Sequence, residues 1–204
     1  VKTKLIAGLG NPGIEYEETR HNAGFMVIER TLEKLRHRHR ELHKYDSRLF
    51  KVQFAGIPLF LAMPQTFMNA SGRALGKILR AYDISPQELL VVYDCLDLPL
   101  GQLRFRQSGG SGGHKGMESI IRTLGTEAVP RCRIGIREQD SAGTVAYVLS
   151  RFSDESAAVF NRVIDTAAEA TLEAVRFGLP QVMNRYNKRI NEPQESGTNE
   201  ENVS

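Results

Sequence analysis

The stretch KLIAGLGNPG, residues 4–13, predicts how the fold begins. Its first half is short, continuous, apolar and followed by glycines, which is typical of a buried strand that runs into a tight turn. The turn, Gly8-Leu9-Gly10-Asn11-Pro12-Gly13, matches the G-x-G-x-x-G pattern of dinucleotide-binding proteins. That pattern requires a helix at the third glycine and an acidic residue at the end of a second strand. Here Asn11-Pro12-Gly13 predicts a turn and Glu29 falls in a predicted helix, so we expect no nucleotide cofactor.

Strand and helix patterns alternate along the rest of the chain. The predicted helices begin after Asn22, span 71–82 and 116–124, and run from Ser153 to Gly178; the predicted strands are 49–54, 59–63, 89–93, 103–106 and 131–136. Asn22 and Ser153 are the expected N-caps of the first and last helix. After Lys188 the sequence is polar and without periodicity, which is typical of disorder. We predict one α/β domain over residues 1–187, with a mixed, twisted β-sheet and helices packed around it, and a polar tail over 188–204.

The composition excludes several classes of protein. The 204 residues carry a net charge of +3, which permits a polyanionic partner without requiring one. Cys95 and Cys132 are far apart in apolar, strand-like sequence, so they indicate reduced core thiols and neither a disulfide framework nor a zinc site. No apolar run reaches the roughly 18 residues of a membrane helix, and no signal peptide precedes the first strand. We therefore expect a cytoplasmic protein without a membrane partner.

Two further patterns suggest chemistry that the surrounding sequence does not support. Gly109–Gly113 is a literal G-x-S-x-G, but a strand with two arginines precedes it, and the last histidine of the chain, His114, follows too closely to serve a serine hydrolase. The stretch RHRHRELHK, residues 36–44, contains His37 and puts His39 and His43 at the i, i+4 spacing of helical zinc ligands. Its arginines and lysine repel a cation, so we interpret it as the solvated basic end of a helix and expect no metal site.

Polar side chains that suit catalysis stand at predicted strand ends and loops: Asn11, His21, Asn69, Asp94, His114 and Lys115. His21 is the best general base, because imidazole titrates near neutral pH, and a carboxylate such as Asp94 would orient it. Asn11 and Asn69 suit holding a water, an amide or an oxyanion. The set lacks a nucleophile, so it indicates hydrolysis by an activated water. Alternatively, each residue serves a turn or a cap, as Asn69 would for the helix from Ser71.

Two pairs of arginines indicate a possible anionic partner. Arg104 and Arg106 are two apart on one predicted strand, and Arg131 and Arg133 on another, so each pair projects from one sheet face. Together with Lys115 and the amides of the glycine loop they would form a phosphate-binding stripe. The alternative is that they are ordinary solvated arginines.

Four blocks, in this order, resemble the bacterial-type peptidyl-tRNA hydrolase family over roughly residues 3–187: GLGNPGIEYEETRHNAGF, PQTFMNASG, VVYDCLDLPLG and GGSGGHKG. The resemblance implies a single-domain α/β monomer that works without metal or cofactor. It implies cleavage of the ester between a nascent peptide and the 3′-terminal ribose of tRNA, which recycles tRNA released prematurely from ribosomes. The implied partner is peptidyl-tRNA, contacted at its acceptor stem and 3′ end.

The same resemblance implies a role for each matching residue. His21 would accept a proton, Asp94 would stabilise its working form, and Asn11 would read the peptide and so distinguish peptidyl-tRNA from aminoacyl-tRNA. The residues expected to contact the substrate are Tyr16, Phe67, Met68, Asn69, Arg104, Arg106, His114, Lys115 and Arg133.

The chain departs from the family pattern at two positions. Cys95 stands where the family usually has an acidic residue, and Lys115 replaces the asparagine of G-G-H-N-G, which normally binds substrate. Lys115 favours an alternative, a catalytically weak RNA-binding relative of the same fold, similar to an organellar splicing factor. The intact His21, Asp94, Asn11 and Asn69 favour the hydrolase. A small-ester hydrolase, a third possibility, would leave the arginine pairs without a purpose.

Overall fold

The computed structural model describes residues 1–36, 39–138 and 145–187, so His37 and the predicted tail over 188–204 lie outside the described residues. The strands are β1 (Leu5–Gly8), β2 (Arg40–Lys44), β3 (Ser47–Phe54), β4 (Ile57–Pro64), β5 (Leu89–Pro99), β6 (Leu103–Arg106) and β7 (Arg131–Arg137). The helices are α1 (Ala23–Lys34), α2 (Ser71–Tyr82), α3 (Lys115–Leu124), α4 (Val145–Val148), α5 (Asp154–Phe177) and α6 (Leu179–Tyr186). Three short 3₁₀ turns, η1 (Arg20–Asn22), η2 (Met68–Ala70) and η3 (Pro86–Glu88), complete the described elements.

The strands form one mixed sheet of seven strands in the order β2-β3-β4-β1-β5-β7-β6. The central strands β4, β1, β5 and β7 run parallel, whereas β2, β3 and β6 pair antiparallel with their neighbours. This arrangement confirms the predicted mixed sheet within an α/β fold.

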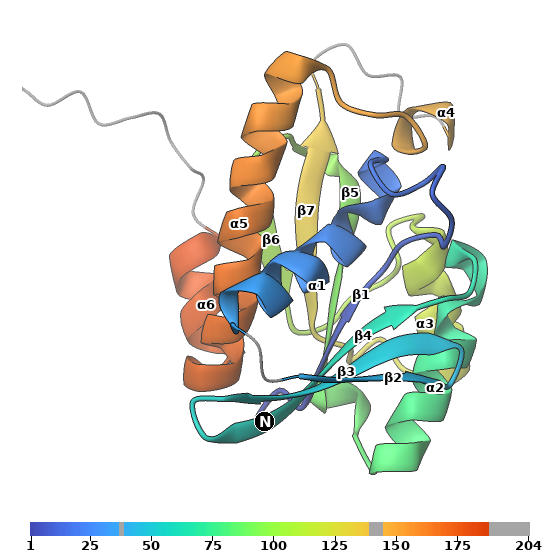
Figure 1. Ribbon diagram of the computed structural model, residues 1–204, viewed down its shortest axis with the longest axis vertical. Coiled ribbons are helices and arrows are strands. Elements are labelled where there is room, and N and C mark those ends of the chain that lie inside the picture. The colour runs from blue at the N-terminus through green and yellow to red at the C-terminus, as the bar shows by residue number, and fades with distance from the viewer. Residues whose placement is uncertain (37–38, 139–144, 188–204) are drawn as a thin grey trace, which may run out of the picture.

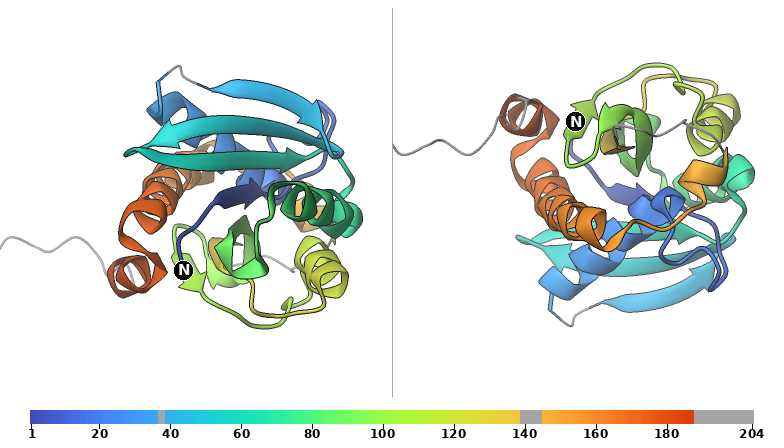
Figure 2. Two further views of the ribbon diagram at one scale, coloured as in Figure 1. Left: turned by 90° about the horizontal axis from the view of Figure 1, so that it is seen from below. Right: turned by 90° about the horizontal axis from the view of Figure 1, so that it is seen from above.

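Helices cover both faces of the sheet, because successive side chains of a strand point to opposite faces. In β1, Ile6 joins an apolar core with α1, α5 and α6, whereas Leu5 and Ala7 join a second core with α2 and α3. Figure 1 shows α1 and α5 lying together on the first face. Figure 2 shows β1 between α5 on one side and α2 and α3 on the other.

Close packing at Gly24 places the start of α1 against the carboxyl end of β1 and the middle of β5. A Cβ atom at this position would lie 2.3 Å from the Leu9 nitrogen and 2.4 Å from the Val92 oxygen, so only glycine fits. As a result η1, which directly precedes α1, lies beside Asp94 in the middle of β5, just beyond the carboxyl end of β1. In open α/β sheets this edge is where ligands bind.

Several predicted boundaries match the structure closely, and one prediction is wrong. The predicted ranges 71–82 and 103–106 coincide with α2 and β6, and Ser153 caps α5 by accepting a hydrogen bond from the Ser156 nitrogen. Within the stretch interpreted as a basic helix end, residues 40–44 instead form β2, paired antiparallel with β3. The hairpin turns through Tyr45 and Asp46, both at positive φ (59° and 52°), which the sequence does not signal with glycine.

The segment after β1 forms a turn, as predicted. Gly13 adopts a φ of +120°, the Tyr16 nitrogen donates to the Gly13 oxygen, and helix α1 begins only at Ala23. The helix that a dinucleotide site requires at Gly13 therefore does not form. Each helix in the described part of the chain is too short or too polar to cross a membrane.

Candidate active site

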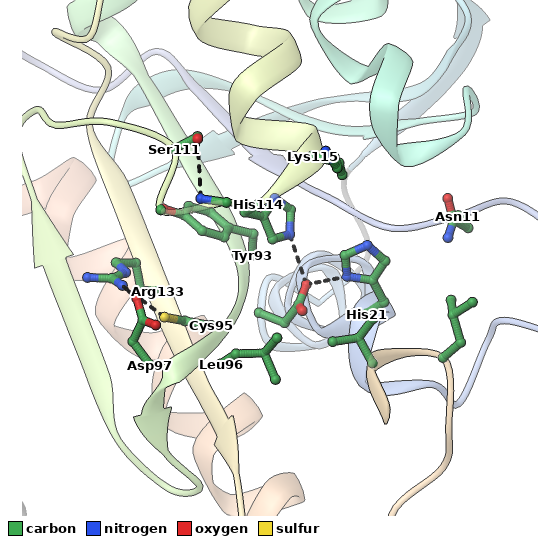
Figure 3. Close-up of a pocket in the computed structure, with 15 residues that line it drawn as sticks. Asn11, His21, Tyr93, Cys95, Leu96, Asp97, Ser111, His114, Lys115 and Arg133 are labelled. Atoms are coloured by element: carbon green, nitrogen blue, oxygen red, sulfur yellow. Dashed lines mark hydrogen bonds and ion pairs between the residues drawn. The ribbon is translucent and has the colours of Figure 1, made fainter. Parts of the chain in front are cut away.

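A pocket of 640 Å³ opens at the carboxyl end of β5, between η1, the glycine loop and α4. Its lining consists of Asn11, His21, Tyr93, Asp94, Cys95, Leu96, Asp97, Ser111, Gly112, Gly113, His114, Lys115, Arg133, Val148 and Leu149. The predicted site residues that the structure brings together here are Asn11, His21, Asp94, His114, Lys115 and Arg133. Figure 3 shows Asn11, His21, His114 and Arg133 coming from different parts of the chain.

Asp94 is the buried centre of the pocket, with 2% of its surface exposed. Its Oδ1 atom contacts two imidazole nitrogens, Nδ1 of His21 at 2.9 Å and Nε2 of His114 at 3.1 Å (Figure 3). Burial alone would raise the pKa of Asp94, but the interactions with His114 and His21 outweigh it, and the pKa lies well below its usual range. Asp94 is therefore an ionised acceptor that both rings face.

The proton positions on the two histidines follow from their other partners. Nδ1 of His114 accepts a hydrogen bond from the Met117 nitrogen at 3.2 Å, which makes His114 the N-cap of α3. The proton of this neutral ring is therefore inferred to be on Nε2, which donates to Asp94. Because Asp94 is ionised, Nδ1 of His21 is also a donor, and Nε2 of His21 is left to accept a proton.

The sequence predicts that His114 contacts the substrate, and in the structure His114 also contacts Asp94. Its Nε2 hydrogen-bonds to the same Asp94 oxygen as His21, and the ring centres of His21 and His114 lie 5.1 Å apart. The sequence carries only part of the signal for this position, because the predicted helix over 116–124 begins two positions after His114, whereas α3 begins directly after it, at Lys115. A residue at that position is a candidate cap whose side chain is fixed by the helix.

The ligand atoms of His21, Asp94 and His114 lie within 4.8 Å of one another, which makes them a candidate metal site among the described residues. A metal-binding histidine normally donates its other N–H to a neighbouring acceptor. His114 does the reverse, because its Nδ1 accepts from Met117 and its proton occupies the nitrogen that a metal would need. The arrangement fits a hydrogen-bonded cluster better than a metal centre.

Asn11 has a fixed orientation at the pocket. Its Oδ1 accepts from the Met68 nitrogen at 2.8 Å, so its Nδ2 group is what it offers to a ligand. Asn22 holds the backbone of Asn11 from both sides: its Oδ1 accepts from the Asn11 nitrogen at 2.8 Å, and its Nδ2 donates to the Asn11 oxygen at 3.0 Å. Asn22 occupies the expected N-cap position, but its side chain positions Asn11 and makes no cap hydrogen bond.

The side chains of the pocket that could act as nucleophiles have other partners. The Ser111 hydroxyl accepts from the Gly113 nitrogen at 3.3 Å, and the Cys95 sulfur accepts from Arg133 Nη2 at 3.0 Å. Within the described residues, neither hydrogen-bonds to His21. The geometry that a serine or cysteine hydrolase requires, a nucleophile bonded to its base, is not formed here.

The two arginine pairs project from the same sheet face, because Arg104 is paired with Arg133 and Arg106 with Arg131 across β6 and β7. Arg133 lines the pocket, and Asp97 holds its Nη2 at 2.8 Å. Arg131 corrects the expectation of a phosphate-facing stripe, because it is 2% exposed and donates to the Val129, Gly110 and Glu127 carbonyl oxygens. Arg131 therefore stabilises the glycine loop through its hydrogen bond to the Gly110 oxygen.

The remaining predicted residues, Tyr16, Phe67, Met68, Asn69, Arg104 and Arg106, do not line the pocket. Met68 is buried and tied to Asn11 through its nitrogen, whereas Phe67 is 62% exposed and Asn69 is exposed beside it. Asn69 does not cap α2, whose N-cap position is Ala70. This segment therefore lies next to Asn11, outside the pocket lining.

The fold and this site define a class of protein, the α/β hydrolytic enzymes that lack a serine or cysteine nucleophile bonded to the catalytic base. Comparison with known proteins defines the family. The profile of the family described as peptidyl-tRNA hydrolase matches residues 5–194, and the chain belongs to this family. It is therefore a hydrolase that acts on the ester bond of peptidyl-tRNA in translation.

Relatives with known sequences and structures agree with this assignment. The chain is 45% identical to the peptidyl-tRNA hydrolase of Aquifex aeolicus (strain VF5) over 91% of its own length and 97% of the relative. It is 44% identical to that of Synechococcus elongatus (strain ATCC 33912 / PCC 7942 / FACHB-805) over 91% and 92% of the two chains. The crystal structure of the Acinetobacter baumannii peptidyl-tRNA hydrolase is similar, with a TM-score of 0.84 at 33% identity, covering 91% of this chain and 95% of that one.

Proposed function

We propose that this protein frees tRNA from peptidyl-tRNA by a water that His21 activates, without a metal ion. The observation that carries the proposal is the pair of contacts to Asp94, which fixes the proton of His21 on Nδ1 and directs the basic Nε2 to the substrate. No described side chain competes as a nucleophile bonded to that base.

In the proposed reaction His21 Nε2 takes a proton from water while the water oxygen attacks the ester carbonyl carbon. Asp94 stabilises the imidazolium that forms, because its buried carboxylate accepts the Nδ1 hydrogen bond. The imidazolium then returns the proton to the ribose oxygen as the bond between that oxygen and the carbonyl carbon breaks. The products are a peptide carboxylic acid and a tRNA with a free terminal hydroxyl.

Asn11 is the proposed reader of the peptide. Its Oδ1 is occupied by Met68, so Nδ2 would donate to a peptide carbonyl or to the oxyanion that develops during attack. Free aminoacyl-tRNA has an ester carbonyl but no peptide carbonyl. A hydrogen bond from Asn11 to the peptide carbonyl would therefore distinguish peptidyl-tRNA from aminoacyl-tRNA. Phe67 and Asn69, the exposed neighbours of the buried Met68, would contact the 3′ end together with Tyr16.

Basic residues supply the proposed contact with the acceptor stem. Arg133 and Lys115 line the pocket, and Arg104 and Arg106 continue from Arg133 on the same sheet face. Phosphate groups bind such a surface with a strength that falls as salt rises. Cys95 and Cys132 are free and buried, which supports the reducing cytoplasm as the compartment, and we propose that the protein acts there as a monomer.

The test is release of labelled peptide from an N-blocked aminoacyl-tRNA by the purified protein, with and without a chelator. Unblocked aminoacyl-tRNA and a small activated ester are the controls. We expect hydrolysis of the blocked substrate only, unchanged by the chelator. Binding of tRNA without hydrolysis would favour the RNA-binding alternative, equal cleavage of the small ester would indicate a general esterase, and loss of activity with the chelator would contradict the metal-independent mechanism.

A further inference from the structure

Arg20 is a buried cation directly before His21, in the same 3₁₀ turn, and the proposed mechanism does not use it. Its side chain is 5% exposed, although no part of it lines the pocket. A buried guanidinium is stabilised only when its donors and its charge find partners. The partners of Arg20 identify what it does.

The guanidinium contacts Glu138, directly after β7, and Ser150 and Arg151, shortly after α4. Nη1 donates to the Ser150 hydroxyl and to the Arg151 carbonyl oxygen, both at 2.6 Å, and Nη2 donates to Glu138 at 2.7 Å. The backbone adds a hydrogen bond from the Arg20 nitrogen to the Ser150 oxygen and a bridge between Thr19 and Arg151. The Arg20 side chain thus contacts residues that are more than a hundred positions away in the sequence.

Two aromatic rings contact the guanidinium. Its central carbon lies 4.3 Å from the ring centre of Tyr147 and 4.2 Å from that of Phe152. The Tyr147 hydroxyl donates to the Ile136 oxygen at 2.6 Å, which fixes this ring to the end of β7. A planar guanidinium can stack on two rings while the N–H groups at its edge donate hydrogen bonds. Arginine makes this arrangement and lysine does not.

The segment held in this way supplies one wall of the pocket. Val148 and Leu149 line the pocket and lie between Tyr147 and Ser150, both of which contact Arg20. Leu149 is 38% exposed, although it is a large apolar residue. The same arginine is joined through the backbone to His21, the proposed base. The Arg20 side chain, together with these backbone contacts, therefore joins the turn that carries the base to this apolar wall.

We propose that Arg20 is a positioning residue for hydrolysis: it fastens the Val148–Leu149 wall to the turn that carries His21, so that the ester is held at the distance the base requires. The charge of Arg20 alone does not achieve this, because the fork of hydrogen bonds and the two ring contacts set the position. The kinetic part of this inference rests on the proposed function, whereas the fastening itself does not.

Hydrogen–deuterium exchange of the whole protein tests the fastening without reference to activity. Arg20→Met is expected to speed exchange at residues 145–152 and to leave α1 unchanged. Arg30→Met is the matched control, because Arg30 pairs with Asp165 between α1 and α5 and touches no pocket residue. If exchange at 145–152 in Arg20→Met equals that of the parent and of Arg30→Met, the fastening is wrong.

Kinetics test the consequence for catalysis. Arg20→Met is expected to lower kcat about 10- to 100-fold, the scale for misplaced reacting groups, while its Kd for deacylated tRNA stays within about twofold. Arg20→Lys keeps the charge and should remain almost as impaired. Arg30→Met should retain the parent kcat. A parent protein without any hydrolysis would contradict the proposed function alone, since the exchange experiment would still decide whether Arg20 holds the wall.

A double-mutant cycle with Leu149→Ala separates positioning from a general loss of stability. If Leu149 acts only when Arg20 holds it, the double variant should lose much less than the product of the two single losses. Independent, multiplicative losses would overturn the proposal. So would full rescue of kcat by Arg20→Lys, or faster exchange at 145–152 with an unchanged kcat.

Discussion

Replacing Asp94 by asparagine is the most informative single perturbation of the site, because the change removes a charge and keeps the shape. In the parent protein one carboxylate oxygen accepts from His21 at 2.9 Å and from His114 at 3.1 Å. An asparagine can turn either its oxygen or its NH₂ group toward that point. If NH₂ faced His21, the proton of that ring would move to Nε2 and the base would be lost, a change worth about 10⁴-fold in the serine protease triad.

His114 decides between these two orientations. Its Nδ1 accepts from Met117, so its Nε2 must remain a donor and requires an oxygen opposite it. The asparagine oxygen therefore stays at the shared position, and His21 keeps its proton on Nδ1. What is lost is the charge. Hydrogen bonds to ionised groups contribute about 1.5–3 kcal/mol and neutral ones about 0.5–1.5 kcal/mol, so the loss is about 1–2 kcal/mol.

We therefore expect Asp94→Asn to lower kcat/KM about 5- to 30-fold, since about 1.4 kcal/mol corresponds to a factor of ten. The imidazolium of the variant lacks its ionised partner, so the acidic limb of the pH profile should move to lower pH. The assay is initial rates of peptide release between about pH 5 and pH 8, where such limbs are measured. Asp94→Asn/His114→Ala should lose considerably more, because nothing then fixes the amide.

Two results would refute this reasoning. A loss of a thousandfold or more in Asp94→Asn would mean that His114 does not control the orientation of the amide. An unchanged rate and an unmoved acidic limb would mean that the carboxylate charge does not act on His21.

Three further predictions concern charge. Arg106→Ala and Arg133→Ala should each weaken substrate binding and reduce the salt dependence of KM, by a log–log slope of about 0.7–0.9 per lost phosphate contact. The measurement is KM at several salt concentrations, with Arg30→Met as the control. A salt-independent KM in the parent would mean that this face does not bind tRNA. Lys115, which is exposed and 3.7 Å from Glu118, should strengthen ground-state binding of the substrate and so lower KM. It lines the same pocket as His21, and its positive charge should disfavour the imidazolium that forms in the reaction. Lys115→Asn should therefore raise kcat and KM together in steady-state kinetics at two salt concentrations, and hydrolysis only after this substitution would support the RNA-binding alternative. The pKa of Asp94 lies below the ordinary aspartate value of 3.8, so its contribution to the free energy of unfolding is complete above that pH and is lost below it. The stability difference between the parent and Asp94→Asn should shrink in acid denaturation below pH 3.8, and a difference that grew there would contradict the lowered pKa.

Local patterns in the sequence predicted most of the fold, because the signals for α2, β6 and α5 lie within each segment. Apolar periodicity and N-caps such as Ser153 are short-range properties. The hairpin that forms β2 escaped prediction for a physical reason. Its turn uses Tyr45 and Asp46 at positive φ, and the pairing of β2 with β3 overrides the basic composition of the strand.

The types of the candidate site residues were predictable, but their partners were not. His21 and Asp94 are separated by 73 positions, and only the fold brings them to 2.9 Å. For the same reason the sequence does not predict that Arg131 is buried under the glycine loop, or that Asn22 hydrogen-bonds to the backbone of Asn11. Asn and Arg side chains carry no local signal that separates a solvated role from a buried one.

The central claim, that His21 is the base that activates water, is tested most directly by single-turnover release of peptide from an N-blocked aminoacyl-tRNA by His21→Ala. The rate should fall by about 10²–10⁴-fold, the usual contribution of a positioned base, while the Kd for tRNA stays near that of the parent. The arginines and Lys115 that would hold the tRNA remain in place in this variant. Turnover close to the parent rate would contradict the account.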